Sequence, residues 1–137
     1  MELYEWTEQF IKFRNIVRRN KIKYELINNT IKVNIQTNKG IEKEIYLIDN
    51  KIENLINLIP ANNKKQKYYL VCLNLKKNVH FVYENWHKLS ILENVLIIFA
   101  EPNTNNKWIL KPHIHNKIIN KENLKEGLLT LHKSVAN

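Results

Sequence analysis

YYLVCLNL, residues 68–75, is the first of two apolar stretches that decide the fold of this chain, and VLIIFA, residues 95–100, is the second. Neither alternates with polar residues, which is typical of strands buried on both faces of a sheet. The segment between them has helical spacing and is long enough for a crossover connection. Crossovers join parallel strands, so we expect two parallel central strands with helices on both faces of the sheet.

The flanking segments extend this core. Apolar residues three and four apart predict helices at about residues 3–19, 50–60, 79–89 and 120–135. Alternation predicts strands at about residues 31–36, 41–47 and 107–112, with Gly40 in a hairpin turn, and a short strand at about residues 22–27 precedes them. The expected fold is a single α/β domain over residues 1–137, a mixed sheet of five or six strands flanked by helices on both faces.

Composition narrows the class of protein. The single cysteine, Cys72, excludes an internal disulfide framework, and the amino-terminal residues lack the layout of a signal peptide. The apolar stretches are too short to span a bilayer. We therefore expect a cytoplasmic protein with no membrane partner.

The chain has a net charge of +9, from 22 Lys and Arg against 13 Asp and Glu. Such a charge favours contact with nucleic acid phosphates, on DNA or RNA. The alternative is lysine enrichment by AT-rich codons on a solvated surface. Under the first interpretation, phosphate contacts fall to Arg18, Arg19, Lys21, Lys23, Lys64, Lys65, Lys67, Lys76 and Lys77.

Glycine, histidine and aromatic patterns concern possible binding or catalytic sites. With only 2 glycines, the chain has no phosphate-binding loop or dinucleotide fingerprint. His113 and His115 share a face if the last strand continues past Pro112, as a zinc pair or acid–base pair would require, although two surface histidines are the simpler interpretation. The aromatic residues near lysines either stack on bases or belong to the core.

Asp49 and the triplet Asn74-Leu75-Lys76 end two of the predicted strands. With the order α-β-β-β-α-β, they resemble the PD-(D/E)XK motif of the restriction-endonuclease-like superfamily. The resemblance implies that Asp49 and a second acid hold Mg²⁺ or Mn²⁺, and that Lys76 polarises the attacking water. Glu42 or Glu44 could supply the second acid if their strand lies beside the site. Asn74 stands where the family has an acid, so one anionic ligand is lost and metal affinity should fall.

Three hypotheses follow. The first is a nucleic-acid-binding protein with a nuclease-like core and a degenerate or absent metal site. The second is an active metal-dependent nuclease, in which Asp49, Asn74 and Lys76 form the catalytic site. The third is a protein–protein interaction subunit, for example a homodimer paired through an exposed edge beside Trp108.

Overall fold

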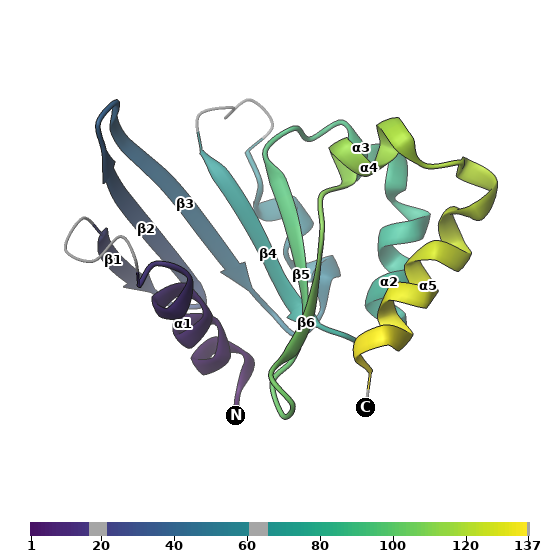
Figure 1. Ribbon diagram of the computed structural model, residues 1–137, viewed down its shortest axis with the longest axis horizontal. Coiled ribbons are helices and arrows are strands. Elements are labelled where there is room, and N and C mark those ends of the chain that lie inside the picture. The colour runs from purple at the N-terminus through teal and green to yellow at the C-terminus, as the bar shows by residue number, and fades with distance from the viewer. Residues whose placement is uncertain (17–21, 61–65, 137) are drawn as a thin grey trace.

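The computed structural model describes residues 1–16, 22–60 and 66–136, and these residues form a six-stranded sheet (Figure 1). The strands are β1 (Ile22–Ile27), β2 (Thr30–Thr37), β3 (Gly40–Ile48), β4 (Lys67–Leu73), β5 (Val95–Glu101) and β6 (Asn106–Leu110). They lie in sequence order across the sheet, with β3, β4 and β5 parallel and all other neighbours antiparallel. The predicted mixed sheet and its parallel central strands are confirmed.

Helices cover both faces of the sheet (Figure 1). One face packs against α1 (Leu3–Arg14), through residues such as Trp6 and Ile11. The other face packs against the remaining apolar helical segments. These are the 3₁₀ turns η2 (Ile52–Asn54) and η3 (Ile56–Leu58) and the helices α2 (Lys76–Glu84), α3 (Trp86–Ser90) and α5 (Leu124–Val135).

The central strands supply both halves of the core. Leu70 and Cys72 of β4 join the cluster under α2 and α5, while Tyr69 and Val71 join the cluster under α1. Successive side chains of a strand point to opposite faces, so a strand covered on both sides needs apolar residues at every position. This explains why residues 68–73 show no alternation.

Several local predictions differ from the structure. The helix expected over residues 50–60 is the two short turns η2 and η3, and the crossover helix is broken at Asn85 into α2 and α3. The first helix ends at Arg14, and residues 17–21 lie outside the described part of the chain. The last helix begins only at Leu124, and Asn120 caps the preceding turn η4 (Lys121–Asn123), where its side chain accepts from the Glu122 N–H.

The last strand does not continue past Pro112, so the condition for a shared histidine face is not met. Pro112 is instead the first residue of α4 (Pro112–Ile118). Proline suits the first turn of a helix, because its missing N–H would have no partner there and its φ is already helical. His113 and His115 therefore lie about 200° apart around a helix and do not share a face.

The strand ends define two opposite edges of the sheet. Strands β1, β3, β4 and β5 run in one direction, so their first residues lie along one edge, named here the amino edge, and their last residues along the opposite carboxyl edge. In Figure 1 the β2–β3 hairpin, α3 and α4 are at the amino edge, and the chain termini are at the carboxyl edge. None of the described helices is long and apolar enough to cross a membrane.

Candidate functional site

The carboxyl edge holds the three residues that carry the nuclease resemblance. Asp49 follows β3, while Asn74 and Lys76 follow the neighbouring parallel strand β4. The backbone N–H of Asp49 donates to the Val71 carbonyl at 3.1 Å, so the two strand ends are side by side. The direction of the side chains then decides whether one site can form.

The Asp49 carboxylate is engaged locally. Its Oδ1 accepts from the Lys51 backbone N–H at 2.9 Å and from Asn54 Nδ2 at 3.1 Å, which closes the turn that starts η2. A cleft of about 540 Å³ opens beside it. Among the described residues, the cleft lining includes Glu2 and Asp49 but no lysine or arginine, which does not favour a phosphate there.

Asn74 is 4% exposed and bonds in a different direction. Its Oδ1 accepts from Trp108 Nε1 at 2.8 Å, and its Nδ2 donates to Glu101 Oε1 at 3.2 Å and to the His132 carbonyl at 3.1 Å. Because an indole N–H can only donate, it fixes the orientation of the amide. The carboxamide thus ties β4 to β5, β6 and α5, and its hydrogen bonds run away from Asp49.

His132 shares this cluster. Its Nδ1 lies 2.8 Å from Asn74 Oδ1, an acceptor, so Nδ1 carries the proton in the neutral ring. Burial lowers the pKa of His132, and the nearby Lys76 and Lys133 lower it further against the opposing effect of Glu101. Lys76 is exposed on the first turn of α2, and its charge acts on His132 of α5 at the carboxyl edge.

Asn78, which the sequence did not single out, joins the ends of β3 and β4. Its Nδ2 donates to the carbonyls of Asn50 at 2.8 Å and Leu73 at 2.7 Å, and its Oδ1 accepts from the Ile52 N–H at 3.1 Å. The only signal in the sequence is an asparagine one position before the apolar stripe of α2. In the structure this asparagine forms hydrogen bonds with backbone groups at two strand ends that have no partner within the sheet.

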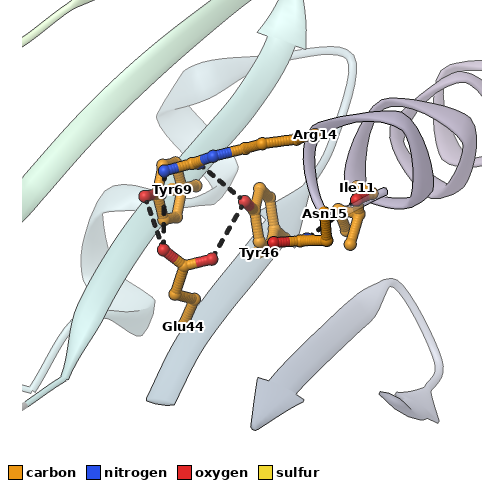
Figure 2. A network of polar contacts seen from close by, with 6 residues as sticks. All are labelled: Ile11, Arg14, Asn15, Glu44, Tyr46 and Tyr69. Carbon is orange, nitrogen blue, oxygen red and sulfur yellow. Dashed lines mark hydrogen bonds and ion pairs between the residues drawn. The ribbon is translucent and has the colours of Figure 1, made fainter. Parts of the chain in front are cut away.

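A second polar cluster surrounds Glu44 on the α1 face of the sheet (Figure 2). Glu44 is 3% exposed, and its Oε2 accepts from Tyr69 Oη at 2.9 Å and lies 3.6 Å from Arg14 Nη2. Its Oε1 accepts from Tyr46 Oη at 3.4 Å, and Tyr46 Oη accepts from Arg14 Nη1 at 3.0 Å. A buried carboxylate is costly unless it is paired and hydrogen-bonded, and this one is both.

The tyrosine rings add packing to this cluster. Tyr46 and Tyr69 stack with centroids 4.3 Å apart, and the Arg14 guanidinium lies 4.9 Å above the Tyr69 ring. Burial, followed by the Glu44 charge, raises the pKa of Tyr69 to about 12 and also raises that of Tyr46. Both phenols therefore remain hydrogen-bond donors at neutral pH.

The structure does not bring Glu44 and Asp49 together. Glu44 lies within β3 and Asp49 follows the end of that strand, five positions later, which is roughly 17 Å along extended backbone. Among the described residues there is no group of three or more His, Cys, Asp or Glu side chains that is placed to hold a metal ion. His113 is placed separately, with Nδ1 2.9 Å from the Ser90 carbonyl.

The predicted phosphate contacts divide between the two edges. Lys23 and Lys67 are exposed near the starts of β1 and β4 at the amino edge, whereas Lys76 and Lys77 are exposed at the carboxyl edge. The remaining predicted contacts lie outside the described residues. These are Arg18, Arg19, Lys21, Lys64 and Lys65.

Few aromatic side chains of the described chain are exposed enough to stack on bases. Tyr68, Tyr69, Trp86 and Trp108 are all 7% exposed or less, so they belong to the core. Tyr83, which also lies near lysines, is more exposed than these four residues, at 37%.

Comparison of the chain with protein-family models, with curated proteins and with solved structures finds no significant match. Functional inference therefore rests on the residues of this chain.

Proposed function

We propose that this protein binds nucleic acid without base specificity, through lysine contacts to phosphates at the amino edge of its sheet. The observation that carries the proposal is the unequal charge of the two edges. Phosphate contacts dominate the affinity of sequence-independent binding, so a concentrated excess of cations is the feature such a protein needs.

The connections at the amino edge are rich in lysine. Among described residues, and apart from the paired Arg14 and Glu44, these connections and the adjoining strand residues hold eight lysines (Lys23, Lys39, Lys43, Lys67, Lys88, Lys111, Lys117 and Lys121) against four glutamates (Glu42, Glu84, Glu93 and Glu122). By sequence, the segments that lead into β1 and β4 add five more cations, at positions 18, 19, 21, 64 and 65.

The connections at the carboxyl edge are nearly neutral. Among described residues, these connections and the adjoining strand residues hold six lysines (Lys32, Lys51, Lys76, Lys77, Lys107 and Lys133) against six acids (Glu2, Glu5, Glu25, Asp49, Glu53 and Glu101). Uniform lysine enrichment by codon usage would raise the positive charge of both edges alike. The difference in charge between the edges therefore supports the nucleic-acid interpretation.

Part of the amino edge is a flat polar surface. Lys23, Asn34 and Lys43 form a row across β1, β2 and β3, since they are paired in the strand register. The neighbours of Asn34 in β2, Val33 and Ile35, point to the α1 face, so this row points to the opposite face of the sheet. Two exposed lysines two strands apart, about 10 Å, can contact one phosphate backbone.

The test compares two variants of equal charge. K39Q/K43Q/K67Q removes three amino-edge cations, and K76Q/K77Q/K133Q removes three carboxyl-edge cations. Fluorescence anisotropy with labelled single-stranded DNA, duplex DNA and RNA is recorded between about 50 and 200 mM salt. If each amino-edge lysine neutralises one phosphate, the slope of log K against log salt falls by about 2.7 on duplex DNA.

The carboxyl-edge variant should keep most of the wild-type slope. Equal losses in the two variants would contradict the assignment to the amino edge. Undetectable or salt-insensitive binding of every probe by the wild-type chain would remove the proposed function altogether.

The nuclease-like core is a separate part of the proposal. We expect no Mg²⁺- or Mn²⁺-dependent cleavage, because Asn74 replaces an acid and its amide is bound to Trp108, Glu101 and His132. Cleavage that is abolished in both D49N and K76A would instead support the alternative, an active nuclease.

A further inference from the structure

Within the part of the chain that the structure describes, the outer strand β1 pairs on one side only, with β2. It pairs with β2 over all six of its residues without a bulge, and five of the six are exposed. Edge strands are usually protected by proline, bulges or inward charges, because their free N–H and C=O groups can pair with another chain. β1 contains none of these protections except Lys23 and Glu25, which carry opposite charges.

The two faces of β1 differ in chemistry. Ile22, Tyr24 and Leu26 pair with the buried residues of β2, so they lie on the α1 face, where Tyr24 is 42% and Leu26 54% exposed. Lys23 and Glu25 lie on the opposite face.

An apolar groove runs between β1 and α1. It has a volume of about 230 Å³ and is lined by Glu8, Ile11, Lys12, Tyr24, Leu26 and Ile31. The exposed apolar side chains of the strand thus continue into a hollow beside the free edge, as in a surface that receives another chain.

We propose that the occupant is a second copy of this chain, whose β1 pairs antiparallel with the first β1 across a twofold axis at Tyr24. In this register Ile22 lies opposite Leu26 of the second copy, and Lys23 lies opposite its Glu25. A twofold interface repeats every contact, so two apolar pairs and two ion pairs flank the central pair of tyrosines.

Neighbouring registers lack this complementarity. A shift of the twofold to Lys23 places two lysines opposite each other, and a shift to Glu25 does the same with two glutamates. A twofold between two residues sets apolar side chains opposite charged ones, since directly paired residues share a face. The register centred on Tyr24 is therefore favoured by both charge and apolar pairing.

The interface is small, because one short strand edge and one groove provide it. Interfaces below the standard size are weak and concentration-dependent, so we expect a dissociation constant in roughly the micromolar range. The dimer does not depend on the proposed function, and it is measured with no nucleic acid present.

The register is tested by disulfide cross-linking. Directly opposed residues in an antiparallel pair have Cα atoms about 4.5–5.5 Å apart, within the range for a disulfide. Y24C should cross-link to itself on mild oxidation, whereas K23C and E25C should not, because their copies are offset by two residues. The native Cys72 is fully buried and does not interfere.

Sedimentation tests the charge pairing. K23E places a glutamate opposite each Glu25 of the other copy, and E25K places a lysine opposite each Lys23, so each variant alone should dimerise at least about tenfold more weakly than wild type. An equimolar mixture restores both ion pairs and should dimerise again. Circular dichroism checks each fold, because E25K also faces Lys32 within its own chain.

Three results would overturn the proposal. If the protein is a monomer at every concentration and Y24C forms no cross-link, the partner of the β1 edge is not a second copy but a strand of a different protein. A dimer unaffected by K23E would place the interface elsewhere, for example at β6. Faster cross-linking of K23C or E25C than of Y24C would give a different register.

Discussion

Replacing Tyr69 with phenylalanine removes one hydroxyl from the buried cluster around Glu44 and leaves the ring in place. The lost hydrogen bond is short, 2.9 Å from Tyr69 Oη to Glu44 Oε2, and its acceptor is a carboxylate that is 3% exposed. Hydrogen bonds to charged groups contribute about 1.5–3 kcal/mol, so Y69F should lower the free energy of unfolding by about 2 kcal/mol.

The matched change at Tyr46 should cost less. Its contact with Glu44 Oε1 is 3.4 Å long, near the limit of a hydrogen bond, and the Arg14 side chain that donates to its hydroxyl is 33% exposed. Water can replace that hydroxyl as the acceptor for Arg14, so we expect Y46F to cost about 1 kcal/mol.

Urea unfolding at neutral pH measures both values, with an unchanged m value as the sign of a comparable unfolded state. Y83F is the control, since Tyr83 is 37% exposed and its loss should change stability by less than about 0.5 kcal/mol. The physical account of the cluster fails if Y69F matches the control, or if Y46F proves the more damaging change.

Three further outcomes are expected. The pKa of Tyr69 is raised from 10.0 to about 12, so the protonated hydroxyl stabilises the fold fully below pH 10.0, and this stabilisation is lost as pH rises toward 12. Unfolding measured against pH should therefore show a smaller loss of stability at alkaline pH in Y69F than in wild type. N74D should destabilise the protein by about 2–4 kcal/mol in urea unfolding, because it turns the amide that donates to Glu101 and to the His132 carbonyl into a second anion, and the loss should shrink at acidic pH. Burial raises the pKa of the Cys72 thiol, so a thiol reagent should react with it only after unfolding, and rapid labelling of the native protein would contradict its buried position.

Sequence patterns predicted the parts of the fold that depend on one strand or one helix at a time. The unbroken apolar residues 68–73 and 95–100 gave two parallel strands buried on both faces, and Gly40 adopts the expected turn with a φ of 121°. Side-chain direction in a strand follows directly from position, so these features need no knowledge of distant residues.

The candidate site was less predictable. Sequence placed Asp49 after one predicted strand and Asn74 and Lys76 after another, and the structure shows that these two strands are neighbours. The sequence gave no account of where the side chains would bond. Trp108, 34 positions from Asn74, and His132, 58 positions away, determine the direction of that amide.

What the sequence by itself determined is a basic α/β domain with one sheet, because net charge and hydrophobic periodicity are sums over local residues. Only the tertiary structure decided that the cations concentrate at the amino edge, that Glu44 is buried between Arg14 and two tyrosines, and that β1 pairs on one side only among the described residues. These properties depend on strand order and direction, which juxtapose connections far apart in the chain, and no local pattern encodes that placement.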